Sequence, residues 1–404
     1  MQEEGDSTAM IDDLWKKHKD RVLDLRRRLH RYPETALQET YTAKVLEEFL
    51  LLYPWFEVRR AAGTGVVAAL AGGAGSGRTM AVRADMDALQ VTETTGLPFA
   101  SERPGYMHAC GHDAHMAMAA GAAVMLAEIR EQWAGSVRFL FQPAEERFGG
   151  AKPMIEAGVL ADPPVEGIMA LHLFPDLPLG KAGFLDGSIM ASNDRFRIVV
   201  RGSSAHAATP ERGIDPVLVA AQIIVALQTV ITREMSALDS VVISFGICRA
   251  GQAYNIIPAE AELEGTVRTL NPLIRDQVAA RMAEIVEKQA AVYGAQAELE
   301  YVRQYPVTVN APSFNRIAAR AAAEVLGKDG AVWLKRPSMM AEDFSFFLER
   351  VPGAMIFLGS GSAGGQPVYP LHHGSFQFDE QVLEYGTKLI VRTVLNFLDS
   401  STVK

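Results

Sequence analysis

Three histidines and one of the chain's two cysteines fall within residues 108–115, inside the stretch MHACGHDAHMAMAAG. Cys110 and His112 flank a glycine, directly before an Ala/Met-rich segment that predicts a helix. Thiolate and imidazole are ligands that zinc and similar divalent ions accept. Both side chains could therefore turn into one site at the start of the helix, which makes this stretch a candidate metal half-site. An inert buried thiol is the structural alternative for Cys110.

Two adjacent acids follow a predicted strand in the stretch FLFQPAEERFGG. The strand ends at Pro143, and Glu145 and Glu146 come directly after it. Ligands and catalytic groups in α/β sheets gather at the carboxyl ends of strands. Neighbouring carboxylates repel unless a cation or a proton lies between them. The pair therefore favours a cation site, with an exposed acidic loop as the alternative.

The remaining histidines fall into two groups. His18 and His30 lie in a charged N-terminal helix, where we expect them to be solvated. The others lie in short segments rich in Gly, Ala or Pro. A single such histidine is more often structural than a ligand, but four segments together favour a site. Outside residues 108–115 these histidines are His172, His206, His372 and His373.

A large α/β domain is predicted to position these groups. The short runs GVVAAL, TMAVRADM, SVRFLF, GIMALHL and AMIFLG are almost continuously apolar, and loops or helical stretches separate them. Strands buried on both faces have this pattern, so we expect an α/β sheet with helices on each side. The first helix has apolar residues at helical spacing and stops at Pro33.

The pattern changes between about Asn193 and Arg303, where strands alternate between apolar and polar residues. The order of strands and helices there is β-α-β-β-α-β, which is the ferredoxin-like plan. We therefore expect a small domain, residues 193–303, inserted into a larger one formed by residues 1–192 and 304–404. Its expected elements are strand 195–202, helix 214–233, strands 240–249 and 259–269, helix 273–293 and strand 296–303.

Composition narrows the class of protein. The chain has 404 residues and a formal net charge of -9, which argues against nucleic acid or an anionic membrane as a partner. The N-terminus lacks the layout of a signal peptide, and the longest apolar run, PVLVAAQIIVAL, has the length of a core helix. Two cysteines suit a reducing compartment, so we expect a cytoplasmic protein. GGAGSGRT lacks the P-loop lysine and leads into a strand, which favours a turn between two strands over a nucleotide site.

Six motifs resemble one known family. They are MHACGHDAHMAM, FQPAEE, GGAKPMIEAGVL, HLFPDLPLG, NIIPAEAELEGTVR and MMAEDFSFF, in this order and over nearly the whole chain. They look like the dinuclear-metal amidohydrolases: hippurate hydrolases, N-acyl-L-amino-acid aminoacylases and indoleacetyl-amino-acid hydrolases. The resemblance implies a metallopeptidase-like mixed sheet with helices on both faces. It also implies that the inserted ferredoxin-like domain is a lid that forms the interface of a homo-oligomer, a dimer or a tetramer.

The resemblance also implies two divalent metal ions per subunit, with zinc, manganese, cobalt and nickel as candidates. His373 follows His372 where the family usually has Ser-Pro, so either histidine could be the last ligand. Asp85 and Asp87 in VRADMDAL are interpreted as groups that orient ligands; strand-end turn carboxylates are the alternative. The implied ligands are Cys110, His112, Glu146, His172 and His372.

The implied reaction is hydrolysis of the amide bond of an N-acyl amino acid, a small-molecule substrate, to a carboxylic acid and a free amino acid. Glu145 would be the general base toward a metal-activated water, and His206 of the lid would reach the partner subunit's active site. Asn255 and Arg268 would hold the substrate's carboxylate. The alternatives are a cysteine-nucleophile amidase that uses Cys110 and a catalytically silent dimeric binding protein of the same fold. The preferred acyl group is not readable from the sequence.

Overall fold

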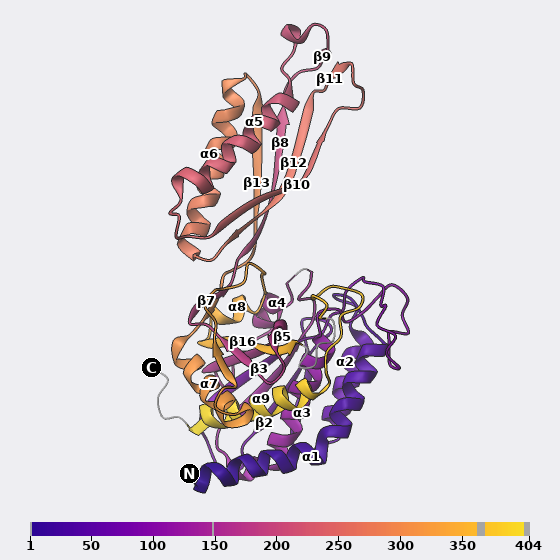
Figure 1. Cartoon of the computed structure of the whole chain (residues 1–404), viewed down its shortest axis with the longest axis vertical. Coiled ribbons are helices and arrows are strands. Elements are labelled where there is room, and N and C mark those ends of the chain that lie inside the picture. The colour runs from indigo at the N-terminus through magenta and orange to yellow at the C-terminus, as the bar shows by residue number, and fades with distance from the viewer. Residues whose placement is uncertain (1, 148, 362–367, 400–404) are drawn as a thin grey trace. The chain divides into compact units, whose positions relative to one another are not determined.

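The computed structural model describes residues 2–147, 149–361 and 368–399 (Figure 1). The chain divides into two compact units. The large unit comprises Met1–Gly187, Val309–Lys335 and Phe346–Lys404, and the small unit comprises Ser188–Thr308 and Arg336–Ser345. The predicted insertion, residues 193–303, lies within the small unit. The small unit additionally takes residues 336–345, which the sequence had assigned to the large domain.

A mixed eight-stranded sheet forms the centre of the large unit (Figure 1). Its strands are β1 (Phe56–Ala61), β2 (Gly65–Ala71), β3 (Thr79–Asp85), β4 (Ser136–Gln142), β5 (Gly167–Pro178), β6 (Ala182–Phe184), β15 (Ala331–Trp333) and β16 (Gly353–Gly361). The order is β1-β2-β4-β3-β5-β16-β6-β15. The central strands β4, β3, β5 and β16 run parallel, and every residue of β3 and β16 is buried. The predicted α/β class is therefore confirmed, because continuous apolar runs form strands covered on both faces.

Helices cover this sheet, and one of them lies inside the core. They are α1 (Gln2–Arg31), α2 (Thr40–Leu50), α3 (His112–Glu128), α4 (Ala151–Glu156), α7 (Pro312–Leu326), α8 (Ser345–Leu348) and α9 (Gln381–Asp399). Helix α3 is buried from His112 to Ala127, because it packs against strand β3 as well as helices α1 and α9. A Cβ at Gly121 would come within 2.8 Å of Val22 Cγ2, so glycine allows α1 to approach.

The N-terminal helix corrects one expectation from the sequence. His18 and His30 are each only 2% exposed, so the prediction that they are solvated is wrong. Both lie on the face of α1 that packs on the core. His30 Nδ1 lies 2.9 Å from Asp113 Oδ2, and its Nε2 lies 3.3 Å from Glu93 Oε1. The surrounding charges in the sequence do not reveal this burial, because they belong to the opposite face of the helix or to buried ion pairs.

The small unit has its own sheet and its own hydrophobic core. Its main elements are β8 (Asn193–Arg201), α5 (Pro216–Thr229), β10 (Val241–Ala250), β12 (Glu260–Thr269), α6 (Pro272–Val292) and β13 (Gln296–Tyr305). The four strands are antiparallel in the order β10-β12-β8-β13, which gives the predicted β-α-β-β-α-β arrangement. A short pair, β9 (Ala205–His206) with β11 (Ile256–Ile257), was not predicted. Strands β7 (Gly187–Met190) and β14 (Thr308–Asn310) lie at two of the four crossings between the units.

Helix α5 is longer than its sequence run indicated. A π-helical turn, Val230–Glu234, extends it, so that a helix of 19 residues runs from Pro216 to Glu234. By length and composition alone this helix could cross a membrane, with a mean hydropathy of 1.6. The run PVLVAAQIIVAL, interpreted from its length as a core helix, is thus part of a longer helix. Only 33% of its apolar window is buried within the chain, which leaves an apolar face uncovered.

Candidate metal centre

The candidate site lies where the carboxyl ends of parallel strands meet the start of α3. Strand β3 ends at Asp85, which pairs with Gln142, the last residue of β4. The loop after β4 carries Glu145 and Glu146, and β5 carries His172. Because parallel strands end at the same edge of a sheet, side chains distant in sequence converge here. This is the edge at which the sequence predicted a cation site.

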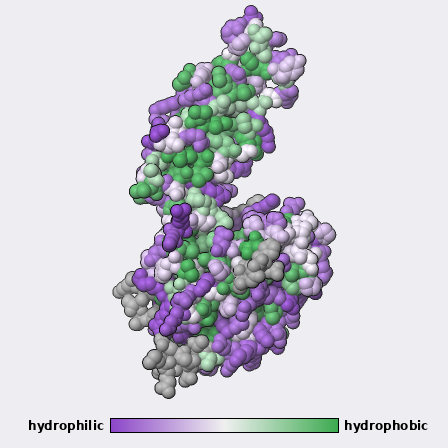
Figure 2. Space-filling view, in the orientation of Figure 1, coloured by the Kyte–Doolittle hydropathy of each residue, from purple (hydrophilic) through white to green (hydrophobic). Residues whose placement is uncertain are grey.

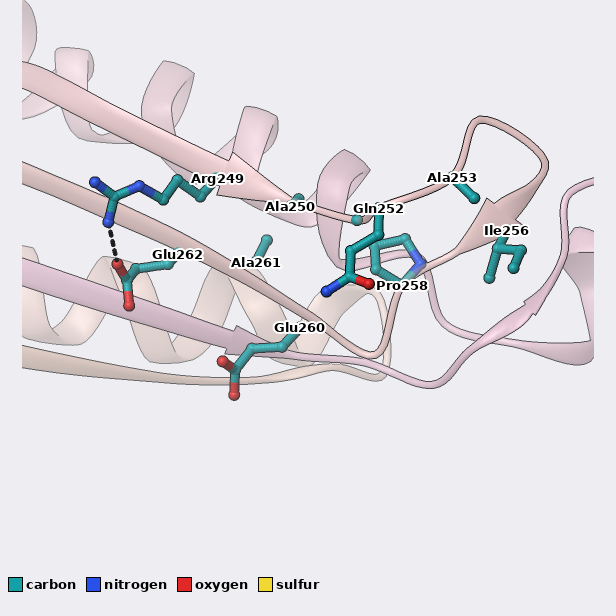
Figure 3. A pocket seen from close by; sticks show the side chains of 10 residues that line it. Arg249, Ala250, Gln252, Ala253, Ile256, Pro258, Glu260, Ala261 and Glu262 are labelled. Carbon is teal, nitrogen blue, oxygen red and sulfur yellow. Dashed lines mark hydrogen bonds and ion pairs between the residues drawn. The ribbon is translucent and has the colours of Figure 1, made fainter.

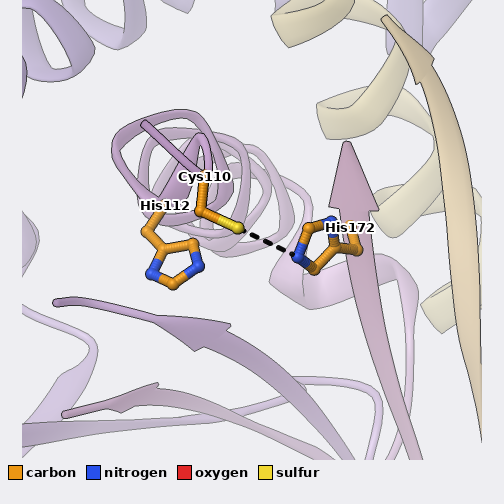
Figure 4. Close-up of side chains that lie close together, drawn as sticks. All are labelled: Cys110, His112 and His172. Carbon is orange, nitrogen blue, oxygen red and sulfur yellow. Dashed lines mark hydrogen bonds between the residues drawn. The ribbon is translucent and has the colours of Figure 1, made fainter. Parts of the chain in front are cut away.

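Gly111 turns the chain so that Cys110 and His112 face the same site. It adopts φ +88° just before α3 begins, a conformation that favours glycine. A Cβ at this position would lie 2.8 Å from Leu173 Cδ1. Figure 4 shows the result: Cys110 and His112 project from the start of α3 toward His172 on β5. The Cys110 Sγ atom lies 3.6 Å from His172 Nε2.

The two imidazoles are oriented by hydrogen bonds from their Nδ1 atoms. His112 Nδ1 lies 2.8 Å from the backbone oxygen of Asp87, and His172 Nδ1 lies 2.8 Å from that of Leu173. A carbonyl oxygen only accepts, so each ring donates from Nδ1 and turns Nε2 into the site. His112 Nε2 is buried and has no hydrogen-bond partner among the described residues. Metal-ligating histidines are held in this way.

The carboxylate of Asp87 shapes the loop that carries the two acids. It accepts the backbone N–H of Glu145 at 3.0 Å and that of Glu146 at 2.9 Å. Ala144 adopts φ +58° just before them, and its N–H donates to Glu39 Oε1 at 2.9 Å. Glu145 is only 6% exposed and the Glu146 side chain 12%. The alternative of an exposed acidic loop is therefore wrong.

The structure separates the two neighbouring histidines 372 and 373. The His372 N–H donates to the oxygen of Ala109 at 2.8 Å, and its Nε2 lies 3.1 Å from Glu146 Oε1. The His373 ring instead stacks on Tyr369, with 4.9 Å between the ring centroids, and its Nδ1 accepts the N–H of Ser375. His372 thus joins Cys110 and Glu146, whose ligand atoms all lie within 4.8 Å of one another.

The assembled site carries an excess of negative charge. Burial by itself lowers the pKa of His112, but nearby carboxylates, above all Asp85 and Asp87, raise it to about 10. Burial, together with Glu146 and Glu145, holds the pKa of the Cys110 thiol well above its usual range. Both raised pKa values have the same cause: the buried carboxylates stabilise a positive charge on His112 and disfavour a further negative charge on Cys110. A divalent cation would supply such a positive charge, so the donor set fits a metal ion.

Three predicted site residues belong to the small unit. His206 and Asn255 lie at its tip, where β9 pairs with β11 (Figure 1). Both are exposed, and the His206 Nδ1 accepts the N–H of Ala208 at 3.0 Å. Arg268, in β12, donates from Nη1 to the oxygen of Met339 at 3.1 Å. The structure therefore groups the predicted ligands and the acid pair in one unit and these three residues in the other.

A groove of about 610 Å³ lies beside this tip, between the end of β10 and the start of β12 (Figure 3). Its polar lining includes Arg249 and Glu262, which pair with one another at 3.5 Å. Gln252 and Pro258, in the centre of Figure 3, also line the groove. This groove has no cluster of metal-ligating or nucleophilic side chains among its lining residues. The buried cluster in the large unit remains the candidate for chemistry.

One member of the cluster received no role from the sequence. His115 Nδ1 lies 2.7 Å from Asp85 Oδ1, and its ring is 4.8 Å from that of His172. Residues three apart lie on neighbouring positions of a helix, so the spacing of His112 and His115 was an available signal.

Known proteins resemble this chain over nearly its whole length. Residues 81–396 match the model of peptidase family M20/M25/M40. N-acetylcysteine deacetylase of Bacillus subtilis is 39% identical, over 94% of this chain and 97% of its own length. IAA-amino acid hydrolase ILR1-like 5 of Arabidopsis thaliana is 35% identical, over 95% of this chain and 88% of its own length. The crystal structure of the Bacillus subtilis YXEP protein, a dinuclear metal binding peptidase, matches with a TM-score of 0.83 and 37% sequence identity. The match covers 95% of this chain and 99% of that one.

Fold and site together define a hydrolase of the metallopeptidase type. The chain belongs to peptidase family M20/M25/M40. The resemblance to dinuclear-metal amidohydrolases is thereby confirmed. A family with a dinuclear-metal member implies divalent metal ions for this chain as well.

Proposed function

We propose that this protein is a metal-dependent amidohydrolase that cleaves N-acyl amino acids to a carboxylic acid and a free amino acid. The observation that carries the proposal is the buried cluster of one thiol, imidazoles and carboxylates with a second acid, Glu145, beside it. Two relatives support this substrate class, since one is named a deacetylase of an N-acetyl amino acid and the other a hydrolase of IAA-amino acids.

The metal ions would be held by five side chains of the large unit. When bound, such ions lower the pKa of a water molecule and polarise an amide carbonyl. Thiolate and imidazole suit zinc, nickel or cobalt, and the carboxylate also accepts manganese. A reducing compartment such as the cytoplasm would keep the thiol reduced. The proposed ligands are Cys110, His112, Glu146, His172 and His372.

Glu145 is the proposed general base. It follows the positive-φ residue Ala144, and its backbone N–H donates to Asp87, so the backbone from which its side chain projects is held in place. The carboxylate would take a proton from the attacking water and return it to the leaving amine. Asp87 thereby fixes the backbone of both acids, because it also accepts the N–H of Glu146.

The small unit would supply groups for the substrate. Because the His206 Nδ1 accepts the N–H of Ala208, its neutral ring carries the proton on Nε2, where it can donate to the oxyanion that forms from the amide carbonyl. Arg268 uses one of its five donors on Met339, and its planar guanidinium suits a carboxylate. Asn255 would assist Arg268 in holding that group.

We further propose that the small unit forms a dimer and that His206 acts in the partner's site. Figure 2 shows hydrophobic residues gathered on the face that carries α5 and α6. On α5, Val217 is 46%, Leu218 50% and Val225 64% exposed. Tyr254, at the tip beside Asn255, is fully exposed. Exposed apolar residues gathered on one face support the proposal that this face is an interface.

A nucleophilic role for Cys110 has less support. Reactive cysteines have a lowered pKa beside a cationic or basic group. Burial and the neighbouring acids raise the pKa of Cys110 instead. His172 turns Nε2 toward the Cys110 sulfur at 3.6 Å, an orientation that suits a metal ligand as well as an acceptor of the thiol proton, so the raised pKa is the observation that speaks against this role.

Release of free amino acid from a panel of N-acyl amino acids tests the proposal. The panel contains acetyl, benzoyl, phenylacetyl and indoleacetyl conjugates, each assayed after chelation and again with Zn, Mn, Co or Ni added. Activity that is lost on chelation and restored by one of these ions supports the metal-dependent reaction and ranks the acyl groups. Activity that resists chelation would favour the cysteine nucleophile. Absence of activity with every ion would favour the silent binding protein.

A further inference from the structure

His115 lies among the groups that could hold a metal ion. Its ligand atoms and those of Asp85 and His112 fall within 4.8 Å of one another. We infer that His115 does not bind metal and is instead a positioning residue, which fixes the ligand His172 relative to the start of α3. The inference rests on the metal centre proposed above.

Both ring nitrogens of His115 are already engaged. Nδ1 lies 2.7 Å from Asp85 Oδ1, an acceptor, so Nδ1 donates. Nε2 lies 3.0 Å from the nitrogen of Leu173, whose N–H donates, so Nε2 accepts. A neutral imidazole has one donor and one acceptor, and this single tautomer satisfies both contacts. No lone pair of His115 is left for a metal ion, whereas His112 Nε2 has no hydrogen-bond partner among the described residues.

The bond to Leu173 acts directly on a proposed ligand. Leu173 follows His172 in β5, and its oxygen accepts from His172 Nδ1. His115 therefore holds the N–H of the same residue whose carbonyl orients the ligand. The His115 ring also packs at 4.8 Å from the His172 ring and 5.5 Å from the His112 ring. A displacement of His115 would move both imidazole ligands.

His115 is in turn held by a buried chain of polar contacts. Asp85 accepts from Arg83 Nη1 at 2.8 Å as well as from His115. Arg83 Nε donates to Gln142 Oε1 at 2.8 Å, at the end of the strand that precedes the acid pair. Asp85, Arg83 and Gln142 are all at most 2% exposed. The contacts thus link the ends of β4 and β3 to Leu173 of β5 through one residue of α3.

Two substitutions at His115 separate positioning from simple packing. His115→Gln keeps one donor and one acceptor on a single amide group, whereas His115→Leu removes both. His18→Leu is the matched control, because His18 is also 2% exposed but lies on α1 beside Glu128 and Tyr53. Cys110→Ser reports on the ligand set itself.

The measurement is the affinity of the metal-free proteins for Zn²⁺ and Co²⁺, by competition with a chelator, together with the visible spectrum of the Co²⁺ form and the melting temperature. We expect His115→Leu to weaken binding by about 10- to 100-fold and to alter the Co²⁺ bands. His115→Gln should recover most of both properties. His18→Leu should lower the melting temperature and leave affinity and spectrum unchanged.

Three outcomes overturn the inference. Wild-type affinity and spectrum in His115→Leu would make His115 a packing residue. If His115→Gln does not recover affinity and spectrum and binds one fewer ion per chain, His115 is a ligand.

A different comparison applies if His115→Leu does not fold. An unchanged spectrum and affinity in His115→Gln then support positioning, and a loss of affinity equal to that in Cys110→Ser refutes it. Unchanged metal content in Cys110→Ser would instead refute the ligand set, independently of His115.

Discussion

The two units present their proposed functional residues in opposite ways. In the large unit, Cys110, His112 and His172 are buried, and hydrogen bonds orient both imidazoles before any ligand arrives. In the small unit, His206 and Asn255 are exposed at a tip, where His206 Nδ1 accepts the N–H of Ala208 and the Asn255 oxygen accepts the N–H of Ala207. The difference teaches that a preorganised centre must be built within one core, whereas groups that meet the substrate can come from an exposed surface.

The largest effect is expected from the acid beside the ligands. Glu145→Gln should reduce kcat by at least about 10²- to 10⁴-fold, because an amide cannot accept the proton of the attacking water. Metal content should stay at the wild-type level, since Glu145 is not a proposed ligand. Activity and metal content per chain are measured in parallel, with Glu57→Gln on the exposed face of β1 as control. Substantial turnover by Glu145→Gln would remove this residue from its role.

His206→Ala tests the exposed side of the comparison. Loss of the donor should lower kcat by about 10²- to 10³-fold while metal affinity is unchanged. If His206 acts in the partner's site, mixing His206→Ala with Glu145→Gln chains should restore about one quarter of wild-type activity, because half of the random dimers carry one complete site.

Carrying a different affinity tag on each variant and isolating dimers that hold both tags establishes whether chains have mixed, and sedimentation of the same samples gives their oligomeric state. Mixed dimers that show no recovery would place His206 in the site of its own chain. A protein that is monomeric and fully active would contradict the proposed dimer.

Asp87→Asn tests whether the hydrogen bonds of Asp87 preorganise the loop of Glu145 and Glu146 in the large unit. An amide offers one acceptor oxygen where the carboxylate offers two, so one of the N–H bonds from Glu145 and Glu146 is lost. We expect metal affinity to fall by about 10- to 100-fold. Competition with a chelator measures the effect, and Asp329→Asn, an exposed aspartate, is the control. Equal affinities in the two variants would show that the loop keeps its shape without Asp87.

The smallest effect concerns stability rather than catalysis. Burial by itself lowers the pKa of His30, but Asp113 and Glu93 outweigh it, so the pKa is raised in the folded protein. The stability that charged His30 contributes is therefore fully present below about pH 6.5 and is lost as the pH rises through the folded pKa. The melting temperature of the wild type should exceed that of His30→Gln most at low pH.

His18 provides the opposite sign as an internal control. Burial lowers its pKa despite the nearby Glu128. Charging His18 opposes folding, so the wild type should lose stability relative to His18→Gln as the pH falls below about 6.5. Parallel pH profiles for His30→Gln and His18→Gln would contradict both assignments.

Much of this comparison was accessible from the sequence. The residues around Cys110, His112 and Glu146 were predicted as a cation site because thiolate, imidazole and carboxylate rarely concentrate at strand ends without a ligand. The strands were predictable because continuous and alternating apolar patterns reflect burial on two faces or on one. The burial of His18 and His30 was not predictable, because a helix whose charged residues form buried ion pairs has the same composition as a helix whose charged residues are solvated.

The sequence by itself determined the α/β class, the ferredoxin-like order of the small unit and the set of residue types able to bind a metal ion. Only the tertiary structure decided which atoms of those residues are available. It turned His372, and not His373, toward Glu146, and it used both nitrogens of His115 on Asp85 and Leu173. The physical reason is that local patterns record burial and chemistry, while the direction of a lone pair depends on partners that are distant in the chain.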